Sequence, residues 1–161
     1  MLGKDHRETL ATMYDLAAIY NRQGRNAEAE KLYKETLEIR RRVLGQDHPS
    51  RLGSVSMLAS VYLNQGRYAE AENLCKETLK IQRRVLRHDH PDTVGSMYHL
   101  ASVAALRGDR KQVLDWLAQA VDHGYKNADG IVNDDDLKSL RGDPAFEKLV
   151  DRARENAGKA K

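Results

Sequence analysis

The sequence predicts an all-α solenoid of stacked helical hairpins, because it repeats at a fixed period and each copy carries helical apolar spacing. Leu2, Leu44 and Leu86 each open one copy, so the period is 42 residues. Residues 2–43 and 44–85 share 24 identities over 42 positions without a gap. A unit of this length buries its apolar face only against neighbouring copies, which is typical of a solenoid.

Each copy predicts two helices joined by a tight turn. The first helix is expected over residues 7–22, 49–64 and 91–106, where apolar residues recur at intervals that keep them on one helical face. A glycine follows each of these helices, where a left-handed residue commonly ends a helix. These glycines are Gly24, Gly66 and Gly108. The second helices are expected to begin near Ala27, Ala69 and Lys111 and to fold back antiparallel.

The period divides residues 1–127 into three units, 2–43, 44–85 and 86–127, and leaves a different segment over 128–161. The third unit departs from the pattern, which is typical of the end of an array.

The C-terminal segment predicts a helical cap over the third hairpin. Residues 127–136 are polar and acidic and are expected to form a loop, followed by a short helix around residues 135–141. Asp143 and Pro144 then suit the N-cap and first position of a last helix. The tail from about Asn156 onward is expected to fray.

Composition excludes several classes of protein. The net charge is only +3, and glutamates share the helix that carries Arg40, Arg41 and Arg42, so no continuous basic face for nucleic acid is expected. No apolar stretch approaches the ~20 residues that span a bilayer, and the first residues do not resemble an export signal. The single cysteine, Cys75, takes the place of Tyr33 and is expected to be buried and reduced. These features predict a cytoplasmic location.

The repeat resembles the tetratricopeptide repeat (TPR). The resemblance rests on Leu16-Ala17, Tyr20, Gly24, Ala29 and Tyr33 in the first copy. The 42-residue period and the Leu-Gly-x-Asp-His-Pro linker are similar to the kinesin-light-chain type. The resemblance implies a right-handed TPR solenoid whose first helices line a concave peptide groove, and scaffold or adaptor function. The asparagines that kinesin light chains carry near this Leu-Ala pair are absent here, so their cargo specificity is not expected.

A second stripe on the first helices is small or hydrogen-bonding, unlike a merely solvated face. We expect it to contact a peptide, although small side chains also relieve crowding inside a curved stack. The hypothesised contacts are Tyr14, Asn21, Arg22, Ser56, Ser60, Asn64, Tyr98 and Ser102.

Catalysis and metal binding are not expected. His6, His48 and His90 recur one hairpin apart, too far to share an ion, and a loop histidine that bonds nearby backbone is the favoured interpretation. The acidic run Asp134–Asp136 lacks the order of a calcium loop. No nucleophile or phosphate-loop motif is present, so we expect no cofactor and no enzyme activity.

The sequence therefore predicts non-catalytic binding of a protein or peptide partner in the concave groove. The alternative is a self-associating or purely structural module, natural or engineered, in which the uncapped N-terminal hairpin forms a homodimer.

Overall fold

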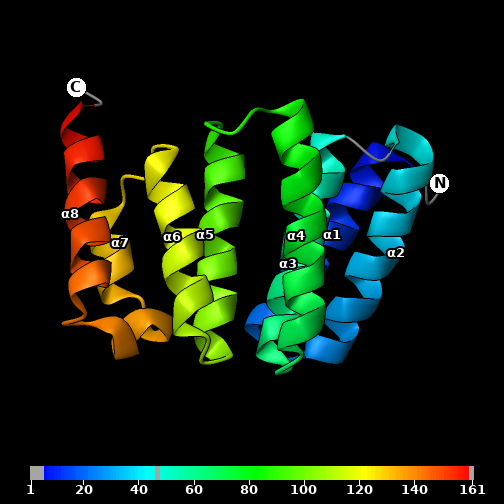
Figure 1. Cartoon of the computed structure of the whole chain (residues 1–161). Helices are drawn as coiled ribbons and strands as arrows, with labels where there is room; N and C mark the ends of the chain where they lie inside the picture. The colour runs from blue at the N-terminus through cyan, green and yellow to red at the C-terminus, as the bar shows by residue number, and fades with distance from the viewer. Residues whose placement is uncertain (1–5, 46–47, 160–161) are drawn as a thin grey trace. The chain divides into compact units, whose positions relative to one another are not determined.

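A computed structural model describes residues 6–45 and 48–159, apart from the side chains of residues 49 and 50. Within these residues every regular element is helical, and long helices follow one another as antiparallel hairpins (Figure 1). The elements are α1 (Arg7–Arg22), α2 (Asn26–Leu44), α3 (Pro49–Asn64), α4 (Tyr68–Val85), α5 (Pro91–Leu106), α6 (Arg110–Asp122), α7 (Ala128–Asn133), the 3₁₀ helix η1 (Asp135–Leu140) and α8 (Pro144–Lys159).

The predicted hairpin helices are confirmed. The three first helices have the predicted bounds, and each second helix begins one residue earlier than expected. The glycines after the first helices have φ of +73°, +72° and +74°, a conformation that costs a glycine little. Each turn therefore reverses the chain within three residues.

The histidines before α1 and α5 act as helix caps. The Nδ1 atom of His6 accepts a hydrogen bond from Glu8 N at 3.3 Å, and that of His90 accepts from Asp92 N at 3.2 Å. The interpretation of these histidines as loop residues that bond nearby backbone is confirmed at both positions. Asp143 caps α8 as predicted, accepting from Ala145 N at 2.9 Å.

By compactness the chain divides into two units, residues 1–81 and 82–161. The boundary falls within α4, whereas the sequence divides repeats from cap at residue 127. The two divisions differ because the first groups residues that pack together in space, whereas the second marks where the 42-residue sequence period ends.

The core of the first unit combines aliphatic and small side chains with a buried tyrosine. Tyr33, Ala29 and Ala17 are fully buried, and Cys75 is buried as expected. Apolar spacing along the first hairpin predicts that Leu16 of α1 and Val43 of α2 face the core. This prediction is wrong at both positions, because Leu16 is 38% exposed and Val43 is 49% exposed.

An arginine joins the first two hairpins. Arg67 Nη1 donates to Glu30 Oε2 at 2.9 Å, and its Nε donates to Glu70 Oε2 at 2.7 Å. The guanidinium lies 4.0 Å from the centroid of the Tyr62 ring. Arg25 stacks on Tyr20 at the same distance, one period earlier.

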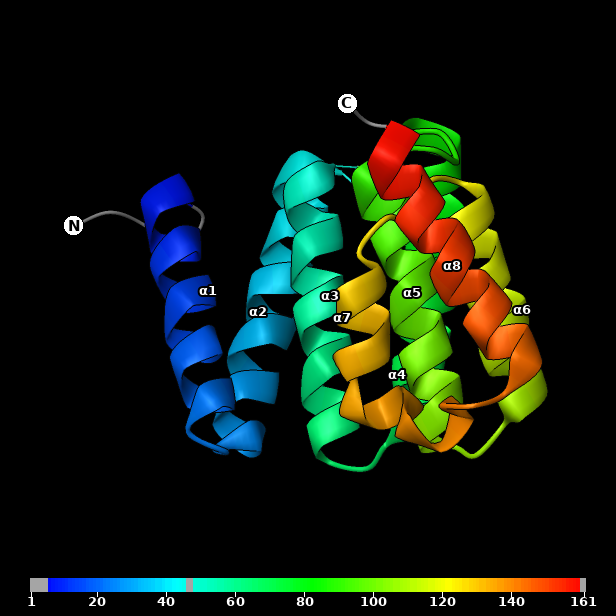
Figure 2. The same ribbon diagram turned by 90° about the vertical axis from the view of Figure 1, so that its left-hand side faces the viewer.

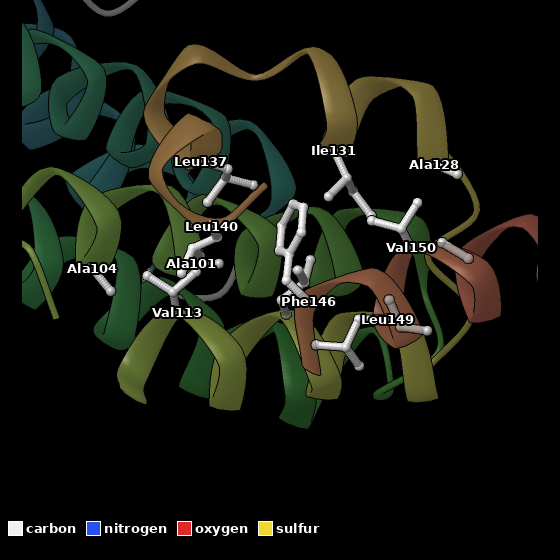
Figure 3. Packing of buried hydrophobic residues seen from close by; sticks show 13 residues of the cluster. Ala101, Ala104, Val113, Ala128, Ile131, Leu137, Leu140, Phe146, Leu149 and Val150 are labelled. Atoms are coloured by element: carbon white, nitrogen blue, oxygen red, sulfur yellow. The ribbon is translucent and has the colours of Figure 1, made fainter. Parts of the chain in front are cut away.

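The core of the second unit unites α5, α6 and the C-terminal helices (Figure 2). Figure 3 shows the ring of Phe146, from α8, pointing toward Ile131 of α7. Phe146, Ile131 and Leu137 are fully buried. The C-terminal segment thus covers the apolar face of the α5–α6 hairpin, as a cap must.

Two details of the predicted cap are wrong. The expected loop over residues 127–136 forms α7 and the start of η1, because Asn127 caps α7 and Ile131 is buried. The expected frayed tail is helical through Lys159. There Asn156 Nδ2 donates to the carbonyls of Val121 and Tyr125, which fastens the last turns of α8.

Candidate functional site

The first helices of the first two hairpins meet near their C-terminal ends within the first unit. Asn64 Nδ2 donates to Asn21 Oδ1 at 2.9 Å, so these two predicted contact residues meet across α3 and α1. Their amides align the C-terminal ends of the two helices. Arg22 is exposed in the adjacent position on the last turn of α1.

Tyr14 is held by the second helix of its own hairpin. Its ring meets that of Tyr33 edge to face, with centroids 5.5 Å apart, and the Arg40 guanidinium lies 5.1 Å from its centroid. Burial raises the pKa of the Tyr14 hydroxyl, and the nearby Arg40 charge partly opposes this rise. Tyr14 is therefore half-buried, and only part of its ring is open to a ligand.

The exposed face of α3 carries small residues. Ser56 Oγ donates to the Leu52 carbonyl at 3.2 Å, which satisfies the hydroxyl within its own helix. Ser60 is half-buried. Gly53 lies in the helix interior, yet a Cβ built there meets no atom within 4 Å. The predicted stripe on α1 and α3 thus carries hydrogen-bonding side chains, with Arg22 at its end and Arg40 beside Tyr14, and it leaves open space above Gly53.

The predicted contacts on α5 are engaged by the chain itself. Tyr98 Oη donates to Asp134 Oδ2 at 2.5 Å, and Ser102 Oγ lies 3.5 Å from the same oxygen. The Tyr98 ring stacks on Tyr125, with centroids 4.7 Å apart and an angle of 8° between planes. Burial, followed by the hydrogen bond to Asp134, raises the pKa of Tyr98 well above its usual range. A peptide that used Tyr98 and Ser102 would have to displace this carboxylate.

The predicted contact residues on α5 are thus occupied by a residue that the sequence pattern did not place there. Asp134 lies 36 positions from Tyr98, and no local pattern indicates their contact. The inward position of Asn156 could have been predicted from the sequence. This residue follows Ala153 by three positions and so continues the buried stripe of Leu149, Val150 and Ala153 on α8.

Nothing in the described ranges gathers metal ligands or forms a membrane span. Residues 6–45 and 48–159 hold no group of three or more side chains able to bind a metal ion. No helix in those ranges is long and apolar enough to cross a bilayer.

Comparison with known proteins identifies the class to which this fold belongs. Tetratricopeptide repeat models match residues 9–50 and 52–123. The chain belongs to the tetratricopeptide repeat family, and its hairpins form a TPR solenoid of the kinesin-light-chain-like type.

Solved structures resemble the chain over nearly its whole length. A crystal structure of nearly identical TPR-like repeats from a Podosopora anserina putative kinesin light chain has a TM-score of 0.73 and 24% identity, covering 100% of this chain and 81% of that one. A single-substitution variant of those repeats has a TM-score of 0.75 and 26% identity, covering 99% and 80%. BtubC (BKLC) from P. vanneervenii has a TM-score of 0.76 and 17% identity, covering 94% and 64%. None of the curated proteins matches the sequence.

Proposed function

We propose that the chain is a non-catalytic interaction module that binds an extended segment of a partner protein along α1 and α3. TPR repeats serve in general as protein–protein interaction scaffolds. The observation that carries the proposal is the hydrogen-bonding stripe on these two helices, where Gly53 leaves free space and Asn21 and Asn64 present amides.

Chemistry of the stripe favours backbone recognition. Amides and hydroxyls donate and accept hydrogen bonds without requiring one partner sequence, and small side chains let a ligand backbone approach. A face of this size is expected to give affinity on the order of micromolar. On α5, Tyr98 and Ser102 become available to a partner only in a complex that displaces Asp134.

The test is selection of linear peptides from a phage-displayed library, followed by fluorescence polarisation with each recovered peptide. Gly53→Gln should abolish binding, because its side chain would occupy the space above α3 that the peptide backbone needs. The helix itself should tolerate the change, since a Cβ at this position meets no atom of the chain within 4 Å. Gly158→Gln is the matched control, since it makes the same change in α8 at another open helical glycine. Recovery of no peptide, or equal binding to both variants, refutes the proposal.

A second function, self-association, is favoured by exposed apolar side chains on α1. Leu16 and Ile19 are 38% and 42% exposed on this helix. A shared apolar face of this kind can form a closed two-fold dimer. Light scattering tests it: Ile19→Asp should convert a dimer to a monomer without loss of helicity. A monomeric parent chain rules it out.

A further inference from the structure

The second unit contains a hollow of about 520 Å³ that the proposed peptide-binding stripe does not use. Three parts of the unit line it: the start of α5, the turn between α6 and α7, and the end of α8. Pockets that hold small molecules in proteins commonly measure roughly 300–1,000 Å³. The hollow is therefore of a size to take a small organic ligand.

Its walls are fixed by specific contacts. Asn156 Nδ2 donates to the Val121 carbonyl at 2.8 Å and to the Tyr125 carbonyl at 3.0 Å, which joins the α6–α7 turn to α8. The Tyr125 ring is in turn stacked on Tyr98. A preformed wall of this kind spares a ligand the cost of ordering it.

The α5 side of the hollow is apolar and open. Pro91 and Val94 line it, together with Gly95 in the interior of α5. A Cβ built on Gly95 meets no atom within 4 Å, although glycine weakens a helix interior relative to alanine. The space above this glycine can therefore accept an apolar group.

The charged groups around the hollow are mostly positive. Lys126 and Lys159 line it, and neither forms an ion pair with any residue that the structure describes. Asp89 is the lining acid, and its Oδ1 lies 3.5 Å from Nε of Arg87. The two ammonium groups are thus available to an anion.

We propose that this pocket binds a small organic acid with an apolar body, an aromatic ring or branched chain, whose carboxylate pairs with Lys126 and Lys159. The body rests against Val94 and the Tyr125 ring, above Gly95. Apolar surface supplies most of the affinity in such sites, and the charged pair fixes the orientation. This site is independent of the peptide-binding proposal, and either can fail without the other.

The test is NMR titration of the full chain with 3-phenylpropanoate, followed through the backbone amides of Gly95 and Gly124. Saturable shifts are expected below about 10 mM, given the affinity that a ligand of this size can reach. 3-Phenylpropanamide keeps the ring without the charge and should bind about tenfold more weakly. Propanoate, which lacks the ring, should give no saturable shift. Equal binding of acid and amide overturns the charge assignment, and absence of saturation by the acid overturns the site.

Two variants locate the site. Gly95→Leu fills the hollow and should abolish the shifts at Gly124, whereas Gly95→Ala, the matched control, adds one methyl group and should preserve them. Lys126→Gln combined with Lys159→Gln should weaken binding about tenfold, with a smaller loss at high salt. These lysines are exposed, so the double variant is expected to fold even where Gly95→Leu does not. Wild-type binding by the double variant overturns the proposal.

Discussion

Replacing Glu30 by glutamine removes a carboxylate that joins the first two hairpins. Lys34 Nζ lies 2.6 Å from one carboxylate oxygen, and Arg67 Nη1 and Gln65 Nε2 lie 2.9 and 3.0 Å from the other. The Glu30 side chain is only 17% exposed, so solvent screens these contacts incompletely. We expect Glu30→Gln to destabilise the protein and to alter its response to acid.

The pKa of Glu30 gives the magnitude. The hydrogen bond from Lys34, followed by those from Gln65 and Arg67, lowers the pKa from 4.5 to about 2 against the opposing effect of burial. That gap corresponds to ~3 kcal/mol of unfolding free energy. Because Lys34 is 52% exposed, we expect about 1–2 kcal/mol in practice. A lowered folded-state pKa makes this stabilisation fully present above pH 4.5 and lost as pH falls toward 2.

Urea unfolding measured between pH 7 and pH 3 provides the assay. The difference between wild type and Glu30→Gln should be about 1–2 kcal/mol at pH 7 and should shrink below pH 4. Glu28→Gln is the matched control, because it removes a carboxylate of the same helix whose partner is the exposed Arg25, and it should leave stability nearly unchanged. A difference that stays constant down to pH 3, or an equal effect of Glu28→Gln, refutes the reasoning.

Three further outcomes are expected. Phe146→Ala should cost about 3–5 kcal/mol in urea unfolding because its ring is fully buried, whereas the exposed Lys148→Ala should change little, and equal effects would contradict the packing of the cap. Tyr98→Phe should cost about 1–3 kcal/mol at pH 7, because it removes the hydroxyl that donates to Asp134 Oδ2 at 2.5 Å. Burial raises the pKa of Tyr98, so wild type should lose stability above pH 10, and an unchanged alkaline profile in Tyr98→Phe would contradict this. Burial raises the pKa of Cys75 to about 11, so its reaction with a disulfide reagent at pH 8 should be about a hundredfold slower than in the urea-unfolded chain.

Helix positions could be predicted because local chemistry sets them. The glycines after α1, α3 and α5 and the prolines at the start of α3 and α5 mark helix ends by conformation alone. The helix α7 was missed because it is only six residues long and its sequence, with Asp129, Gly130 and Asn133, is locally weak. Burial of Ile131 in the core of the second unit stabilises this helix, and the contacts that bury it lie outside any local sequence window.

The sequence could predict on which helix face the candidate contact residues lie, but not which other residues of the chain contact them. Helical spacing places Asn21 on α1 and Tyr98 on α5 at equivalent faces. It cannot indicate that Asn21 meets Asn64, or that Asp134 reaches Tyr98 from a segment outside the repeats. Exposure of Leu16 was missed for a similar reason, since an apolar stripe shows which face is buried but not how far the neighbouring surface extends.

The arginine link between hairpins limits where the array can be lengthened by recombination. Arg67 meets Glu30 from the preceding repeat, and Glu72 stands one period after Glu30. An inserted duplicate of residues 44–85 would bring its own arginine to Glu72. The third hairpin instead has Asp109 at that position, where it caps α6. Unequal crossing-over can therefore add units in register before the third hairpin, while a unit added after it would meet the surface that the C-terminal helices already cover.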